Sequence, residues 1–429
     1  MNSNAESSSA PVKEPDFHAG IAWNVASLFV LAVAGIALNA LIARLYGSAM
    51  LGVFNQVLCA YILFSMAAAG GINYSLLASI AESPRDSARV ASAVVGALLP
   101  TIILATIVTA LFYGSRHWIA DRLQSEGIAI GMRAATPGLF FFALNKQLLA
   151  VVNGLRRMRA FAIYQALRYV LILGGFVIGW QTALAGEQLS FVWSFAEGIL
   201  FVVLAIEVGI QVAWRSATNI MHWSRTHLIF GSKSVVSAML LELNAKVDIW
   251  MLGLWLDDAS VGVYSFAANL AEGFYQLIIV LQNNFNPLMA NLIARGERIE
   301  LEAMISKSRR WIVPAFAATA LAAALIYPWT MPLLKGPEFA DSGVSFAILV
   351  GAIGALAAWL PFGNLLLMAK HPAWNSLLMA LVVGVNVAVN ALLIPKLGIA
   401  GAAVGTATAF VAFALLLKLF VRRLIGVRL

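Results

Sequence analysis

Charged residues are scarce in this sequence, since Asp, Glu, Lys and Arg together make up 11% of its 429 residues. Soluble globular proteins carry about 25% charged and about 45–50% apolar residues. Here 61% of the residues are hydrophobic, and the mean hydropathy is +0.87. Soluble cores cannot bury that much apolar surface in a chain of this length. The composition therefore excludes a soluble protein and predicts one whose solvent is largely lipid.

Cysteine, metal-binding and nucleotide-binding patterns are also missing. The single cysteine, Cys59, lies in an apolar stretch, which excludes a disulfide framework and a cysteine metal cluster. The five histidines are scattered and form no HExxH spacing. No GxxxxGK(S/T) loop is present, which excludes ATP hydrolysis by that route. We therefore expect no cofactor, and a driving force that comes from a gradient or from the substrate.

The chain has little sequence outside its apolar runs. The largest connection expected on the outer side, residues 112–128, leaves no room for the acid/base chemistry of a glycan polymerase or ligase. Residues 1–17 are polar and rich in serine, and they lack the basic start and short apolar core of a secretory signal. We interpret them as a flexible cytoplasmic tail.

What remains is a series of long apolar segments. A membrane-spanning helix needs about 20 predominantly apolar residues. Windows of that size predict an all-α polytopic membrane protein with twelve transmembrane helices. The predicted spans are residues 20–44, 50–81, 89–113, 128–154, 160–183, 188–213, 227–254, 259–294, 310–334, 342–369, 373–395 and 399–421.

Lysine and arginine are distributed unequally between the connections. With the N-terminus inside, seventeen basic residues fall in inner segments and six in outer ones. Because cytoplasmic loops carry the basic excess, we predict that both termini are cytoplasmic, and that the net charge of +8 does not reflect binding to nucleic acid. Residues 295–310 mix charged and apolar positions, which predicts an interfacial amphipathic helix between spans eight and nine. A solvated connector is the alternative for this segment.

A short internal repeat divides the chain near its middle. Residues 51–54 (LGVF) open span two, and residues 261–264 (VGVY) open span eight at an offset of 210 residues, which Asn73 and Asn283 share. Because this offset covers six spans, an even number, the two halves have the same orientation. We predict two six-helix lobes related by a parallel repeat, at residues 18–213 and 227–429, with a cytoplasmic linker at 214–226.

Polar and charged side chains persist inside several spans. Each charge near mid-bilayer costs roughly 2.5–3.5 kcal/mol on insertion scales, so it is expected to face protein or water. On span eight the polar residues form a stripe within a sector of roughly 60°, at about 100° per residue. We interpret these groups as the lining of a central cavity. The candidate substrate-binding residues are Lys146, Arg168, Lys233, Lys246, Asp248, Asn269, Glu272, Gln276 and Asn283.

Bonding between helices is the alternative role for these groups. Glu242 precedes Lys246 by four residues on span seven, which is the favourable order for an ion pair within one helix. We therefore expect Lys246 to pair mainly with Glu242. Lys146, Arg168 and Lys233 have no identifiable partner in their own helices, which favours a role in binding substrate.

Three segments, in the right order, resemble the polysaccharide-unit flippases of the multidrug/oligosaccharidyl-lipid/polysaccharide exporter superfamily. They are residues 40–57 (ALIARLYGSAMLGVFNQV), 245–272 (AKVDIWMLGLWLDDASVGVYSFAANLAE) and 390–409 (NALLIPKLGIAGAAVGTATA). The resemblance covers nearly the whole chain. It implies twelve helices in two lobes around a cavity that opens alternately to the two sides of the membrane.

The resemblance also implies a cargo. That cargo is an undecaprenyl-pyrophosphate-linked oligosaccharide, moved from the inner to the outer leaflet of the bacterial inner membrane for lipopolysaccharide O-antigen or exopolysaccharide synthesis. Lys146, Arg168, Lys233 and Lys246 are the basic residues that would hold its pyrophosphate, although five acids accompany them. The implied partners are membrane lipid and glycan-assembly proteins, and coupling to H⁺ or Na⁺ stays open.

Three other functions compete with the flippase. A cation-coupled multidrug exporter of the same superfamily would bind Na⁺ or H⁺, and a cationic drug, at Asp248 or Glu272. A membrane-bound glycan polymerase or ligase is disfavoured because the outer connections are short. A membrane-bound scaffold for glycan assembly is the third alternative.

Overall fold

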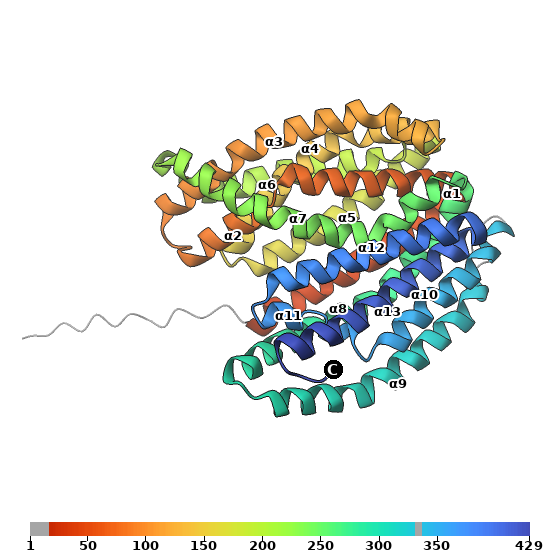
Figure 1. The fold of residues 1–429 in the computed structure, drawn as a ribbon. Coiled ribbons are helices and arrows are strands. Elements are labelled where there is room, and N and C mark those ends of the chain that lie inside the picture. Colours follow the sequence, from red (N-terminus) through yellow and green to blue (C-terminus); the bar gives the residue numbers. More distant parts are fainter. Residues whose placement is uncertain (1–16, 331–336) are drawn as a thin grey trace, which may run out of the picture.

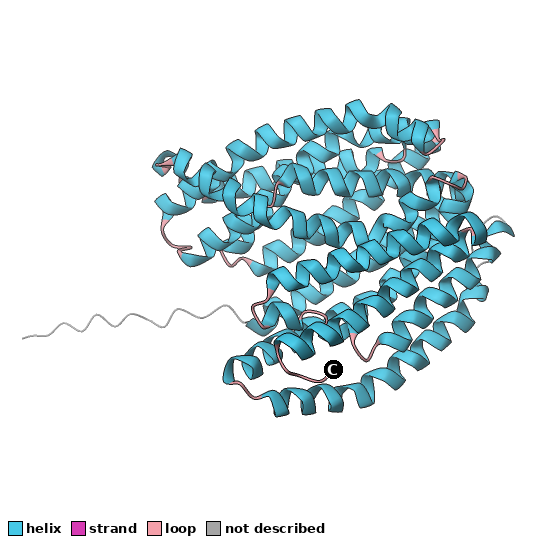
Figure 2. Cartoon of the chain, in the orientation of Figure 1, coloured by secondary structure: helices cyan, strands magenta, loops and turns pink. Residues whose placement is uncertain are grey.

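The structure is a computed structural model that describes residues 17–330 and 337–429, and all of its regular elements in these ranges are helical (Figures 1 and 2). Residues 1–16 of the expected tail lie outside the described residues, and Phe17 already begins α1. The helices are α1 (Phe17–Ala69), α2 (Ile72–Glu82), α3 (Ser87–Arg122), α4 (Glu126–Gly154), α5 (Met158–Gln181), α6 (Phe191–Gln211), α7 (Ile220–Gly253), α8 (Asp258–Arg295), α9 (Arg298–Thr330), α10 (Ser342–Leu356), α11 (Leu365–Met368), α12 (Pro372–Leu397) and α13 (Ile399–Leu424). Four short 3₁₀ turns lie between them: η1 (Gly186–Gln188), η2 (Trp214–Ser216), η4 (Pro337–Asp341) and η5 (Leu360–Phe362).

The prediction of a twelve-helix membrane protein is confirmed. Within the described ranges, ten helices are long and apolar enough to span a membrane. One of them, α1, is two spans joined at Gly47, whose φ of 88° breaks the helix. Only glycine adopts such a backbone conformation at little cost. The twelfth span is α7, whose 34 residues include the charged residues Lys233, Glu242, Lys246 and Asp248.

Two predicted spans are interrupted in the structure: residues 50–81 at Gly70 and Gly71, between α1 and α2, and residues 342–369 after α10, at η5 and α11. Two predicted boundaries between spans differ as well. The expected interfacial helix at residues 295–310 is not a separate element, because residues 298–310 form the first turns of α9. No glycine or proline lies between Arg298 and Pro314, so the helix is continuous there, with Leu301 and Ile305 buried and Ile299 85% exposed. The second difference is that α7 starts at Ile220, inside the segment expected to be a linker.

The helices are arranged in two groups, which we call the N-lobe (α1–α6) and the C-lobe (α8–α13). Figure 1 shows them as the upper and lower halves of the molecule. α7 contacts both lobes. Near its start, His227 bonds to the Ser75 hydroxyl and the Ala93 carbonyl of the N-lobe, at 2.8 and 3.1 Å. Near its end, Asp248 accepts a hydrogen bond from Thr406 of the C-lobe.

The lobes meet where the predicted repeat places equivalent residues. A Cβ atom on Gly52 of α1 would lie 1.9 Å from the carbonyl oxygen of Asp258. A Cβ atom on Gly262 of α8 would lie 1.9 Å from the carbonyl oxygen of Ser48. The two contacts are equivalent in the repeat, because Gly52 corresponds to Gly262 and Ser48 to Asp258 at the offset of 210 residues. Two parallel helices therefore touch through backbone alone, in the small-xxx-small arrangement that allows close helix packing in membranes.

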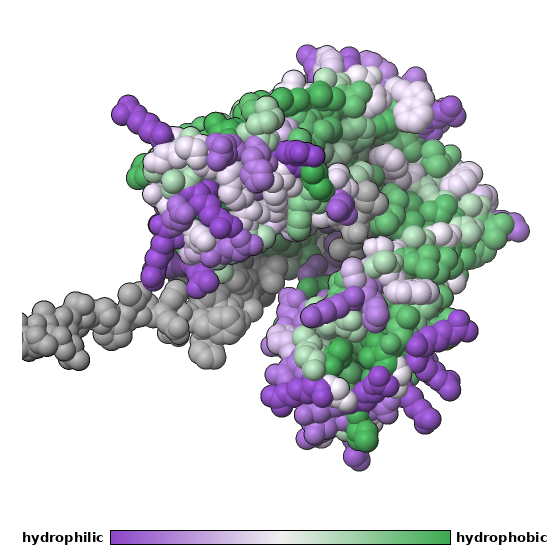
Figure 3. Space-filling view, turned by 60° about the vertical axis from the view of Figure 1, so that its left-hand side comes forward, coloured by the Kyte–Doolittle hydropathy of each residue, from purple (hydrophilic) through white to green (hydrophobic). Residues whose placement is uncertain are grey.

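This contact joins only one end of the bundle. We call it the sealed end, and it carries Gly47, Ser125 and Asp257. The other end, which carries residues 83–86, 155–157 and 296–297, we call the open end, because the two lobes diverge toward it (Figure 1). The space-filling view shows the surface hollowed between the lobes (Figure 3). The structure is thus a wedge-shaped arrangement that opens toward one side of the membrane.

Replacing Gly52 or Gly262 with alanine is expected to push the lobes apart at the sealed end, because the new methyl group would overlap a backbone carbonyl. Cys59 reports on this change, since it is the only cysteine and is 2% exposed, beside α7. We expect Cys59 to react faster with a maleimide in either variant, in protein reconstituted in nanodiscs. Gly174→Ala is the control, because its Cβ would meet nothing within 4 Å. Equal rates in Gly52→Ala and the unaltered protein would contradict the expectation.

Candidate functional site

Hydrogen bonds between the lobes surround the glycine contact at the sealed end. Asp258 at the start of α8 accepts one from Gln56 of α1 at 2.7 Å and one from Ser125, before α4, at 2.6 Å. In the other direction, Ser48 of α1 donates to Glu338, in η4, at 2.8 Å. Because Ser48 and Asp258 are equivalent in the repeat, each of these two residues forms a hydrogen bond from its own lobe to a connection of the other lobe.

Three asparagines continue the seam between the lobes toward the middle of the membrane. Asn55 and Asn269 each donate to the side-chain oxygen of Asn39 at 3.0 Å. Asn269 also donates to Asn55 at 3.2 Å. Sequence reasoning identified Asn269 as part of the stripe on span eight. It missed Asn39, a single amide within an apolar segment, and Asn55, which lies beside Gln56 near the start of span two.

The other stripe residues point across the hollow. Asn269, Gln276 and Asn283 are spaced by seven residues and therefore share one face of α8. Because Asn269 meets α1 of the N-lobe, this face is directed at the N-lobe. Toward the open end, where the lobes diverge, Gln276 is half-buried and Asn283 is exposed. This face of α8 forms the C-lobe side of the hollow.

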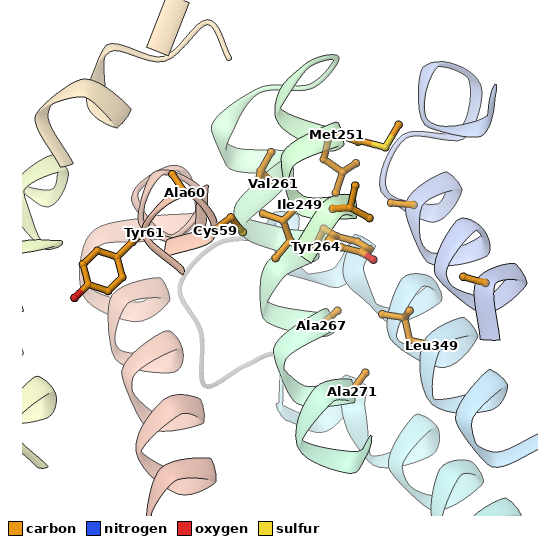
Figure 4. Packing of buried hydrophobic residues seen from close by; sticks show 14 of the residues in the cluster. Cys59, Ala60, Tyr61, Ile249, Met251, Val261, Tyr264, Ala267, Ala271 and Leu349 are labelled. Atoms are coloured by element: carbon orange, nitrogen blue, oxygen red, sulfur yellow. The ribbon is translucent and has the colours of Figure 1, made fainter. Parts of the chain in front are cut away.

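Asp248 lies in a buried polar cluster inside the C-lobe. Its carboxylate accepts hydrogen bonds from the Tyr264 hydroxyl, from the Ile249 amide at 2.9 Å and from Thr406 at 3.2 Å. Figure 4 shows that Tyr264 points from α8 toward helices of its own lobe, away from α1. Asp248 is 5% exposed, so it does not line the hollow as the sequence suggested.

The cluster around Asp248 belongs to the C-lobe alone. At the offset of the repeat, Leu38 corresponds to Asp248, and Phe54, which lacks the hydroxyl, corresponds to Tyr264. Nearby on α12, Asn390 donates to Asn386 at 2.9 Å, while the side-chain oxygen of Asn390 is buried without a hydrogen-bond partner. A carboxylate beside amide and hydroxyl oxygens is a donor set that suits Na⁺ or H⁺. Among the described residues, no group of three or more His, Cys, Asp or Glu side chains could hold a metal ion.

Arg168 is held in a buried ion pair within the N-lobe. Its Nε lies 2.7 Å from Oε1 of Glu197 on α6, and the two side chains are 10% and 4% exposed. Asn145 donates a further hydrogen bond to Glu197 at 2.8 Å, and the guanidinium lies 5.0 Å from the centre of the Phe142 ring. The partner of Arg168 was not identifiable from its own helix because it lies on the next one. In this arrangement Arg168 joins α5 to α6.

The predicted pairing of Lys246 with Glu242 is wrong. Nζ of Lys246 lies 2.7 Å from Oε2 of Glu272 on α8 instead, and no ion pair joins Lys246 to Glu242. A spacing of four residues makes a pair within one helix possible, but α8 packs against α7 and offers a second carboxylate. Lys246 and Glu272 therefore link two neighbouring helices at the edge of the hollow.

Lys146, Lys233 and Glu242 form no ion pair within 4 Å in the described part of the chain. Lys146 on α4 is half-buried, with Nζ 5.4 Å from the centre of the Phe142 ring. Lys233 is exposed on α7. Of the basic residues predicted to bind substrate, Lys146 and Lys233 are thus available, whereas Arg168 and Lys246 are paired.

This chain is similar to known membrane proteins in part of its sequence and in its fold. No protein-family model matches the chain. A curated relative, the "Probable low-salt glycan biosynthesis flippase Agl15" of Haloferax volcanii, is 24% identical over 226 residues, which are 50% of this chain and 47% of that protein. The matched region thus spans about half the length of this relative.

Two solved structures share the fold. The lipid II flippase MurJ in an inward closed conformation superposes with a TM-score of 0.76 at 14% identity, covering 94% of this chain and 87% of its own. An inward-facing multidrug resistance MATE transporter of the MOP superfamily gives 0.72 at 14% identity, covering 92% and 98%. The chain is a multi-pass helical membrane protein that shares its fold of two lobes and twelve helices with these two structures. The second of them is described as a transporter of the MOP superfamily.

Arg168→Gln is expected to lower the free energy of unfolding by about 3–5 kcal/mol, because it leaves the Glu197 carboxylate buried without a counter-charge. Adding Glu197→Gln is expected to restore part of this loss. Arg157→Gln, which removes the more exposed pair with Glu207, is the control and is expected to cost about 0–1 kcal/mol. Thermal unfolding in detergent measures all three. A fully stable Arg168→Gln protein that fails only in transport would indicate that Arg168 binds substrate directly.

Proposed function

We propose that this protein is a flippase that moves a lipid-linked oligosaccharide across the bacterial inner membrane by alternating access, without catalysing a reaction. The observation that carries the proposal is the hollow between two lobes that touch at one end only (Figure 3). A polar head group that crosses a bilayer needs such a protein-lined path, because unpaired polar groups are costly in hydrocarbon. The named relatives, a glycan biosynthesis flippase and the lipid II flippase MurJ, support a cargo of this class.

We propose that the open end faces the cytoplasm and that both termini lie there. The basic connections favour this orientation under the positive-inside rule. The C-terminal residues lie at the open end, where the backbone amide of Arg428 donates to Glu302 near the start of α9. A hollow that opens to the cytoplasm would receive a substrate assembled on the inner leaflet. The step of transport would then be closure of the open end and separation of the lobes at the sealed end.

Polar groups without an ion-pair partner favour a substrate with both anionic and uncharged polar parts. Lys146 and Lys233 offer unpaired cations, and the face of α8 with Gln276 and Asn283 offers amides. A lysine ammonium is a strong binder of phosphoryl oxygens, and amides bond well to sugar hydroxyls. A pyrophosphate-linked oligosaccharide of the O-antigen or exopolysaccharide type presents both chemistries. Membrane lipid around the lobes and glycan-assembly proteins at the open end are the partners this function needs.

Lys146→Gln is expected to slow flipping about tenfold, the effect of losing one charge-assisted hydrogen bond. The assay uses proteoliposomes that contain a fluorescent undecaprenyl-pyrophosphate-linked oligosaccharide, and it follows the access of an impermeant sugar oxidant to the label. Lys396→Gln, which alters an exposed lysine in the last turn of α12, is the control and is expected to flip at the unaltered rate. The flippase proposal would be rejected if the unaltered protein left the labelled oligosaccharide as well protected from the oxidant as it is in liposomes without protein.

A second observation favours cation coupling, which an exporter of the same fold would share. The Asp248 cluster provides a buried carboxylate whose equivalent in the repeat, Leu38, is apolar. We propose that it binds H⁺ or Na⁺ and that the bound cation changes the packing of α7 against α8 and α13. The function of the cluster then is to couple a gradient to the movement of the lobes.

Asp248→Asn is expected to abolish the dependence of flipping on an imposed Na⁺ or H⁺ gradient, because asparagine keeps the shape of the side chain but loses its charge. The rate in Asp248→Asn proteoliposomes is compared with and without each gradient. Asp257→Asn removes a carboxylate from the exposed N-cap of α8 and is expected to keep the gradient dependence. Unchanged gradient dependence in Asp248→Asn would assign coupling to another group.

A further inference from the structure

The ion pair between Lys246 and Glu272 lies where the hollow ends. Glu272 follows Asn269 by one turn on α8, on the side toward the open end, and Asn269 belongs to the amide seam between the lobes. Lys246 is beside the same seam, because the Cys59 sulfur of α1 contacts its backbone oxygen at 3.9 Å. Figure 4 shows Cys59 facing the α7–α8 pair from α1. A ligand that enters from the open end would meet this ion pair before the seam.

The two partners differ in their access to water. The Lys246 side chain is 12% exposed and the Glu272 side chain is 45% exposed. The Arg168–Glu197 pair, by contrast, is 10% and 4% exposed. Separating that pair would leave two buried charges. Glu272 can turn into water at little cost, but Lys246 cannot, so Lys246 needs another anion in place of the carboxylate.

We propose that Lys246 and Glu272 form an exchangeable anion site, in which phosphoryl oxygens of the substrate replace the Glu272 carboxylate on the Lys246 ammonium. This inference rests on the proposed flippase function and identifies where the phosphoryl group binds. The exchange trades one charge-assisted hydrogen bond for another, so the ammonium is never left unpaired. In the absence of substrate, Glu272 acts as a built-in competitor that keeps Lys246 neutralised.

The shape of the ligand, and not the surrounding charge, favours a diphosphate over a second carboxylate at this site. Glu242 and Asp248 lie on the same helix as Lys246, so the local charge alone does not attract an anion. A diphosphate has several oxygens and can contact Lys246 while a second oxygen extends toward Lys146. Such a ligand would connect the two lobes across the hollow, which the Glu272 carboxylate, on α8, does not do.

Binding of undecaprenyl pyrophosphate to the purified protein tests this exchange, because the two partners should have opposite effects. Glu272→Gln removes the competitor and is expected to tighten binding about tenfold, whereas Lys246→Gln is expected to weaken it about tenfold. Lys246→Arg keeps the charge and is expected to retain binding. Glu300→Gln removes an exposed acid from the first turn of α9 and is the control for a general loss of negative charge, with no expected change.

Two further ligands identify the chemistry that is bound. Inorganic pyrophosphate is expected to show the same opposite effects at lower affinity, and undecaprenol, which lacks phosphate, is expected to show neither. Effects of equal size on undecaprenol would overturn the assignment to phosphoryl oxygens. Thermal unfolding of each variant shows whether it is folded. If Lys246→Gln does not fold, the test rests on tighter binding of undecaprenyl pyrophosphate by Glu272→Gln.

Weaker binding in both Glu272→Gln and Lys246→Gln would overturn the exchange and show that the pair only holds α7 to α8. That result leaves the proposed function intact when the unaltered protein still flips lipid-linked oligosaccharide. The proposed function would instead be rejected if the unaltered protein neither bound undecaprenyl pyrophosphate nor flipped the oligosaccharide. The two failures are therefore distinguishable in the same set of proteins.

Discussion

The contact between Gly52 and Gly262 is the constraint on which the arrangement of the two lobes depends. Because neither residue has a Cβ atom, α1 and α8 approach until each glycine meets a backbone carbonyl of the other lobe. The hydrogen bonds of Ser48 and Asp258 close the same end of the bundle, and the divergence of the lobes follows at the other end. Any larger side chain at either glycine would separate the lobes at this point, so this contact determines which side of the membrane the hollow faces.

Charge is distributed so that each lobe is held together more strongly than the two lobes are held to each other. No ion pair among the described residues joins the N-lobe to the C-lobe: Arg168 and Glu197 are both in the N-lobe, and Lys246 and Glu272 join α7 to the C-lobe. Across the seam, the donors are neutral side chains: Gln56, Ser125 and Ser48 donate to the carboxylates of Asp258 and Glu338, and Asn269 donates to Asn39 and Asn55. Water can replace a hydrogen bond between neutral groups at a small net cost. Separating the lobes would therefore break no ion pair among the described residues.

Much of the fold was predictable because lipid imposes a simple length and composition on each spanning helix. The break at Gly47 and the start of α8 near Asp257 agree with spans read from apolar windows. The repeat was detectable because its tightest contact requires glycine at both Gly52 and Gly262. The continuous start of α9 was not predicted, because polar residues at the end of a span resemble a separate interfacial helix in the sequence.

The candidate site was less predictable, for a physical reason. Sequence spacing identifies partners within one helix, so it favoured Glu242 for Lys246, and the partner on α8, Glu272, depends on how the helices pack. Arg168 was given a role in binding for the same reason, since its partner lies on α6. The stripe ending at Asn283 was visible because helical periodicity alone places its members on one face. Contacts between helices require the three-dimensional structure.

The central claim is that the lobes move as units about the glycine seam when substrate binds. Two pairs of spin labels report the distance between the lobes. One pair, at Ser87 and Glu300, is exposed at the open end, and the other, at Asp121 and Lys396, is exposed at the sealed end. Pulsed EPR is measured on Cys59→Ala protein in nanodiscs, with and without lipid-linked oligosaccharide. With substrate, the open-end distance should shorten while the sealed-end distance lengthens. Two distances that stay constant, or that change in the same direction, would contradict the account.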